Sequence, residues 1–103
     1  MKDTQIKICG INYDIRFKPG EAMGGLIGSA NFNTQEISIN TDHSPQTQKI
    51  AILHEILHII SDSYNLKWDE ESVKFSTHAL LALFIDNPAL INDLMWHDAN
   101  VGE

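Results

Sequence analysis

The feature that decides the expected fold is the stretch Ile50–Ile60, which reads IAILHEILHII. Its apolar residues fall on every side of a helix, and this pattern predicts a buried central helix. Residues four positions apart share one helix face, so His54 and His58 can reach the same metal ion. Glu55 lies about 100° further round, where it can contact a metal-bound water rather than the metal. The arrangement suits hydrolysis and predicts Glu55 as the catalytic residue.

A buried histidine pair beside a glutamate needs partners for its polar atoms, and a metal ion supplies one. The alternative is a pair of core histidines whose ring nitrogens are satisfied by hydrogen bonds within the protein. We favour the metal, because it also gives Glu55 a role.

Length and composition exclude several classes of function. At 103 residues and 43% hydrophobic content, we expect one domain, residues 1–103, with one core. Seven basic and fourteen acidic residues give a net charge of −7, without a basic cluster, which argues against nucleic-acid binding. A single cysteine, Cys9, fits a reducing compartment. We find neither a secretory signal nor an apolar run that could span a membrane, so we expect a cytoplasmic protein. Its oligomeric state stays open.

The N-terminal half has the alternating pattern of strands. Residues 6–8 and 11–17 predict one hairpin, and residues 26–32 and 36–40 predict a second hairpin across the polar turn at 33–35. We therefore expect an antiparallel sheet of about four strands. We expect the segment 36–39 to be an edge strand, along which an extended peptide substrate can bind through backbone hydrogen bonds.

Helices follow the strands, which predicts an α+β fold. Ser44 and Pro45 form a strong helix start, and the helix that carries the histidines should run to about residue 61. The next helix should run from near residue 69 to about 86, where Asn87 and Pro88 stop it. A short third helix is expected from residue 89 to about 96.

Catalytic zinc usually takes three protein ligands and keeps a position for water, so a third ligand is needed. The residue six after His58 is Tyr64, which excludes the pattern that places the third ligand in the following turn. At 100° per residue, Glu70 falls in the same arc as the apolar Val73, and Glu71 falls at its edge. We therefore predict that Glu70 points at the histidine helix. Glu71 stays an alternative, since acidic residues also simply favour a helix N-terminus.

These motifs resemble those of a known group of enzymes. A histidine pair in H-E-x-x-H, followed some dozen residues later by a helix that opens with glutamate, resembles the gluzincin branch of zinc peptidases. The layout of strands and then helices is similar to minimal versions from phages and prophages, akin to the ImmA/IrrE peptidase family. The resemblance covers roughly residues 26–88. It rests on residues 54–58, the run Glu70-Glu71-Ser72-Val73 and the helix start Ser44-Pro45.

The resemblance implies a small zincin-like domain that holds Zn²⁺ through His54, His58 and Glu70. It also implies Glu55 as general base and a peptide or protein as substrate. The chain departs from the ImmA/IrrE pattern at Val73-Lys74, where that family has Ala-Asn. The further domains of those proteins are not expected here, so their regulatory role does not carry over.

In such a site, zinc lowers the pKa of its water toward ~7, and Glu55 accepts the proton as the water attacks the amide carbonyl. Tyr64 and His78 are candidates for stabilising the oxyanion, although Tyr64 can equally be a packing residue and His78 a solvated one. Two rival functions stay open. One is a catalytically inactive or accessory metal-binding protein of phage type that acts through a partner, and the other is a metal-free helical interaction protein.

Overall fold

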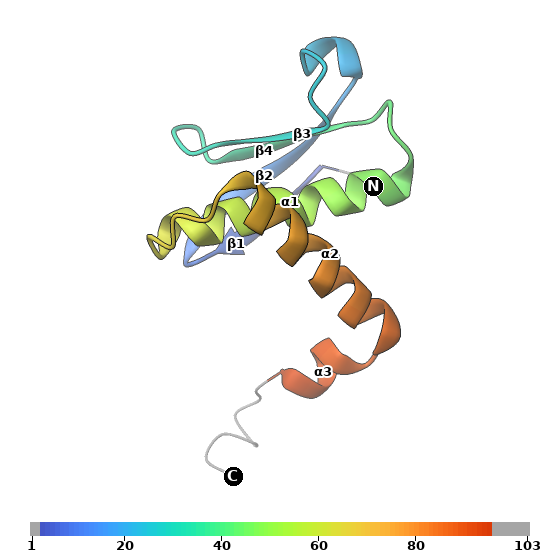
Figure 1. Cartoon of the computed structure of the whole chain (residues 1–103). Coiled ribbons are helices and arrows are strands. Elements are labelled where there is room, and N and C mark those ends of the chain that lie inside the picture. The colour runs from blue at the N-terminus through green and yellow to red at the C-terminus, as the bar shows by residue number, and fades with distance from the viewer. Residues whose placement is uncertain (1–2, 96–103) are drawn as a thin grey trace.

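The structure is a computed structural model that describes residues 3–95. It has the predicted α+β architecture, with strands in the N-terminal half and helices after them (Figure 1). The elements are β1 (Thr4–Ile8), β2 (Ile11–Lys18), the 3-10 helix η1 (Gly20–Ala22), β3 (Gly28–Asn31), β4 (Glu36–Asn40), α1 (Pro45–Ser63), α2 (Glu70–Asp86) and α3 (Leu90–Leu94). Among the described helices, none has the length and apolar character needed to cross a membrane.

The four strands form one sheet in the order β1-β2-β4-β3. Both predicted hairpins are present as antiparallel pairs, but β2 and β4 run parallel, with Ile15 opposite Ile37. The sheet is therefore mixed, and the expected all-antiparallel pairing is wrong at its centre. The reason is that the apolar β4, with Ile37 and Ile39 fully buried, takes the central place where both of its sides are paired.

This order also corrects the expected edge strand. The segment 36–39 lies inside the sheet, and the small residues of β3 lie at the edge. Within the described part of the chain, no strand pairs with the outer side of β3.

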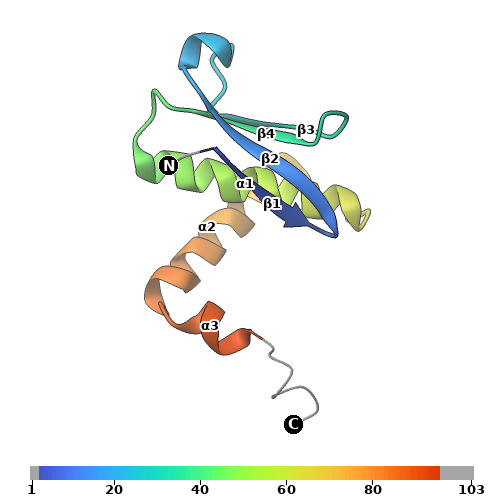
Figure 2. The ribbon, with the colours of Figure 1, turned by 180° about the vertical axis from the view of Figure 1, so that it is seen from behind.

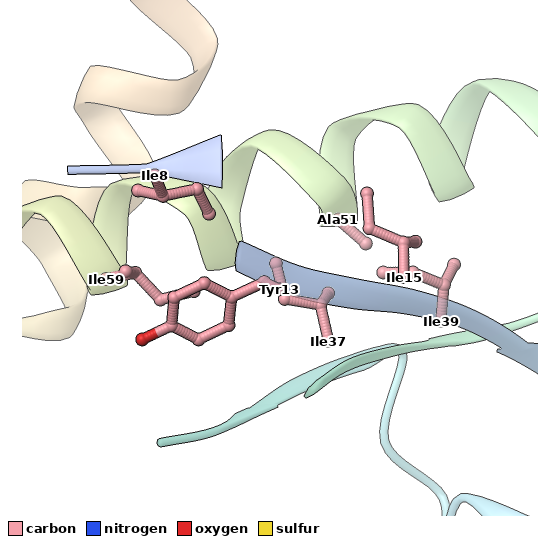
Figure 3. Packing of buried hydrophobic residues seen from close by; sticks show 7 residues of the cluster. All are labelled: Ile8, Tyr13, Ile15, Ile37, Ile39, Ala51 and Ile59. Atoms are coloured by element: carbon pink, nitrogen blue, oxygen red, sulfur yellow. The ribbon is translucent and has the colours of Figure 1, made fainter. Parts of the chain in front are cut away.

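The core lies between the sheet and α1 (Figure 3). Its buried members come from β1, β2, β4 and α1, and they are Ile8, Tyr13, Ile15, Ile37, Ile39, Ala51 and Ile59. The predicted start of α1 is confirmed, since the Ser44 hydroxyl accepts a hydrogen bond of 3.2 Å from the Thr47 amide. The helix is buried on two sides rather than all round, because Ala51 and Ile59 face the sheet while Leu57 and Ser61 lie on the opposite side of the helix.

Helix α2 packs against α1 and then extends away from the sheet, followed by α3 (Figures 1 and 2). Asp69 caps its N-terminus, accepting a hydrogen bond of 2.7 Å from the Ser72 amide. Val73 and Thr77 are its buried residues. The short helix expected from residue 89 to about 96 is present as α3, and residue 96 lies outside the described residues.

Candidate metal centre

Helix α1 holds the two histidines one turn apart and on the same face. Ala51 and Ile59 fix this helix in the core, so its histidine face has a defined orientation. The Nε2 atoms of His54 and His58 lie 3.2 Å apart, and the two rings meet edge to face with centroids 4.8 Å apart. The side chains are 21% and 28% exposed, so the pair lies at the floor of an open site rather than inside the core.

Glu70 is the first residue of α2 and brings a carboxylate to both histidines. Its Oε1 lies 2.6 Å from Nε2 of His54, and its Oε2 lies 2.9 Å from Nε2 of His58. Packing of the buried Val73 against the rest of the fold sets the rotation of α2, so that Glu70 faces α1 as the helical arc predicted. Glu71 is exposed and is not part of this group.

The three side chains fit a divalent metal ion. Each offers one ligand atom, and these atoms all lie within 4.8 Å of one another. Tetrahedral zinc, with bonds of about 2.0–2.1 Å, needs ligand atoms about 3.4 Å apart. The closest separations, from 2.6 to 3.2 Å, are a few tenths shorter, so a small spreading of the side chains would admit an ion. Two imidazole nitrogens and one carboxylate are also a donor set that catalytic zinc uses.

Glu55 follows His54 on α1 and lies beside this group. Burial raises the pKa of the Glu55 carboxyl, while the charges of His54 and His58 act to lower the pKa and that of Glu70 acts to raise it. The strand β3 passes close above it, since a Cβ atom added to Gly28 would lie 3.4 Å from Cγ of Glu55. A carboxyl in this position can exchange a proton with a group bound between β3 and the histidines.

Two cavities flank the group, and Glu55 lines both. We call them the loop cavity and the apolar cavity. The loop cavity, of about 460 Å³, is lined by His58, by Ser29 and Ala30 of β3, and by the loop between α1 and α2. The apolar cavity, of about 440 Å³, is lined by His54, Glu70, Gly28 and the segment before β3. Strand β3 thus runs past the group from one cavity to the other.

The structure does not bring the two oxyanion candidates to the group. Tyr64 is 66% exposed and lines a separate hollow with Cys9 and Tyr13. His78 is exposed and lies eight residues after Glu70, about 12 Å further along the axis of α2. Neither side chain lines the loop cavity or the apolar cavity.

Two residues that sequence reasoning did not select do line the loop cavity. Asn65 and Lys67 belong to the loop between α1 and α2, and both have left-handed backbone conformations, with φ of 55° and 56°. Their position in the sequence could have indicated them, because a loop between the histidine helix and the helix of the third ligand must pass beside the metal group. Their side chains offer N–H donors there.

The sequence matches a known peptidase family over the part of the chain that carries this site. Residues 10–82 match the profile of the IrrE N-terminal-like domain, a peptidase family, over more than half of the chain. The match includes the two histidines, Glu55 and Glu70. Comparisons with curated proteins and with solved structures gave no match. The family that the resemblance indicated is thereby confirmed.

Proposed function

The chain belongs to the peptidase family described as the IrrE N-terminal-like domain, and from this premise we propose that it is a zinc-dependent metallopeptidase. His54, His58 and Glu70 are the proposed metal ligands, and Glu55 is the proposed general base. The observation that carries the proposal is the carboxylate of Glu70, which a second helix holds within 2.9 Å of both histidine Nε2 atoms. A shared metal ion accounts for this convergence of three ligand atoms.

The chemistry follows from where the side chains lie. When bound, zinc supplies a Lewis acid that polarises a carbonyl and lowers the pKa of water toward ~7. The Glu55 carboxylate accepts the proton from the attacking water and then returns it to the leaving amide nitrogen. An atom that could stabilise the oxyanion lies on Asn65 in the loop cavity rather than on Tyr64 or His78.

The edge strand supports a peptide or protein as substrate. The outer backbone groups of β3 can pair with an extended chain, which would then cross the metal group between the two cavities. This role, expected for the segment 36–39, falls to residues 28–31.

The finer features of the proposal rest on the donor set and the composition. Zinc suits two imidazoles and a carboxylate, and it has no redox chemistry of its own. We propose a cytoplasmic location, with which the free and exposed Cys9 is compatible. We also propose that residues 1–103 form one domain, of the phage or prophage type.

Zinc analysis together with three proteins tests this function. We expect the wild type to bind one zinc ion and to cleave unstructured peptides, as detected by mass spectrometry. Glu55→Gln should bind zinc normally and lose cleavage. Glu71→Gln is the matched control, because Glu71 is exposed and outside the metal group, and it should keep both properties. Unchanged cleavage by Glu55→Gln would exclude this residue as the base. Stoichiometric zinc without cleavage by the wild type would instead support an accessory metal-binding protein.

A further inference from the structure

The two cavities beside the metal group differ in chemistry. The apolar cavity has walls of Leu26, Ile27, Ile50 and Ala51. The loop cavity has the polar side chains of Asn65, Lys67 and Asp62 among its lining residues. We infer that the site selects peptides that place an apolar side chain in the apolar cavity and a carboxylate beside Lys67 in the loop cavity. This inference rests on the proposed peptidase function and names its substrate class.

Lys67 offers a free positive charge in an acidic protein. The chain has a net charge of −7, so a lysine in the lining of the loop cavity stands out against its background. Among the ion pairs of the described residues, all formed within 4.0 Å, none involves Lys67. Its ammonium group is therefore available for an anion that enters the loop cavity.

The backbone holds this lysine in place from both sides. The amide of Leu66 donates to the carbonyl of Ser61 over 2.8 Å, and the amide of Trp68 donates to the Ser61 hydroxyl over 2.9 Å. Ser61 is itself buried in α1. The loop is thus fastened to α1 directly before and directly after Lys67, so the backbone of this residue is held at the cavity.

A peptide paired with β3 can reach both cavities at once. An extended chain advances about 3.3 Å per residue, and every second side chain points to the same face. Gly28 borders the apolar cavity and Ser29 borders the loop cavity, so residues on the two sides of the scissile bond face different walls. The carboxylate can come from an aspartate or glutamate side chain or from the C-terminus of the peptide.

Asp62 sharpens the prediction because it lines the same cavity as Lys67. Its charge repels a substrate carboxylate and weakens the attraction of Lys67. Replacing it with asparagine should therefore strengthen the preference for an acidic peptide, and adding Lys67→Gln to this variant should remove the part of the preference that depends on Lys67.

The test measures binding rather than turnover. The zinc-loaded Glu55→Gln variant is titrated with labelled hexapeptides that are capped at both ends. One of the two central positions carries leucine or serine, and the other carries glutamate or glutamine. Each pair is tested in both orders along the peptide. We expect the peptide with leucine and glutamate to bind most tightly, with glutamate favoured over glutamine by about two- to fivefold. A free C-terminal acid compared with its amide distinguishes the two sources of the carboxylate.

Variants in the same background assign the effect to its residues. Lys67→Gln should abolish the preference for glutamate and Lys67→Glu should reverse it, whereas Lys49→Gln, an exposed lysine outside both cavities, should keep it. Leu26→Ser should reduce the preference for leucine. Its control is Ile85→Ser, which replaces another exposed aliphatic residue near the C-terminal end of α2 and should leave the preference intact.

Several outcomes would overturn the inference: equal affinities for the glutamate and glutamine peptides, a preference that survives Lys67→Gln, or no binding of any peptide in the set. The proposed peptidase function is tested separately from the peptide preference, because hydrolysis is measured on the wild type. Hydrolysis without a preference for acidic peptides would remove the inference alone. The preference without hydrolysis would remove the proposed catalysis and leave the recognition.

Discussion

The two helices that meet at the metal group are held in very different ways. Helix α1 packs on the sheet through residues such as Ile59, which is fully buried together with Ile37 and Ile39 beneath it. Helix α2 packs mainly on α1, and toward its C-terminal end Leu83 and Ile85 are exposed. The histidines therefore lie on the anchored helix, and Glu70 lies on one supported from a single side.

This difference suggests what a metal ion adds to the fold. An ion held by His54, His58 and Glu70 would join α1 to α2 at the point where α2 begins. Because α2 packs mainly on α1 whereas α1 also packs on the sheet, such a link should matter more for α2 than for the sheet and α1.

The largest effect should come from the core beneath α1. Ile37 is fully buried, so Ile37→Ala should lower the free energy of unfolding by about 2–5 kcal/mol through lost burial and a cavity. Ile85→Ala is the matched change on α2, where the side chain is 71% exposed, and it should stay within about 0.5 kcal/mol. Urea unfolding of the metal-free proteins measures both. Equal losses would show that the end of α2 is as well packed as the core.

Zinc should give the next largest effect. At a zinc concentration a hundredfold above the dissociation constant, binding should stabilise the fold by about 2.7 kcal/mol. Glu70→Gln should lose most of this gain, and Glu71→Gln should keep it. Hydrogen exchange should show the added protection in the first turns of α2 more than in β4. Protection confined to the sheet would contradict a link between the two helices.

A change in the contact between α1 and α2 should have a smaller effect on the free energy of unfolding. Val73 is fully buried on α2, and Val73→Ala removes two methyl groups' worth of burial, or about 1–2 kcal/mol. It should also weaken zinc binding, because it loosens the helix that presents Glu70. Lys74→Ala, at the next and exposed position, should change neither unfolding nor zinc affinity. Zinc affinity that is unchanged in Val73→Ala would mean that Glu70 is positioned without this contact.

Features governed by local geometry could be predicted from the sequence. The capped start at Ser44, the shared face of His54 and His58 and the inward turn of Glu70 all follow from helix periodicity and end signals. The position of Glu55 directly after His54 also predicted its role as general base, which remains a proposal.

Features that depend on distant parts of the chain could not be predicted. The parallel pairing of β2 with β4 joins two hairpins, and neither hairpin's own pattern specifies which strand faces the other. The position of Lys67 depends on left-handed residues in a loop, and a lysine in a sequence does not indicate a left-handed backbone, because this conformation is uncommon outside glycine. For the same reason, Tyr64 and His78 looked available as oxyanion donors although the fold directs them elsewhere.

The smallest effect concerns the cap that begins α2. The hydrogen bonds from Ser72 hold the pKa of the Asp69 carboxyl below its ordinary value. A lowered pKa in the folded state means that the cap stabilises fully above the ordinary pKa and loses this contribution as pH falls through the folded value. The Ser72 amide should therefore show an acid titration by NMR in the wild type, and Asp69→Asn should abolish it while keeping an acceptor. A titration of the Ser72 amide that persists in Asp69→Asn would show that it does not come from the Asp69 cap.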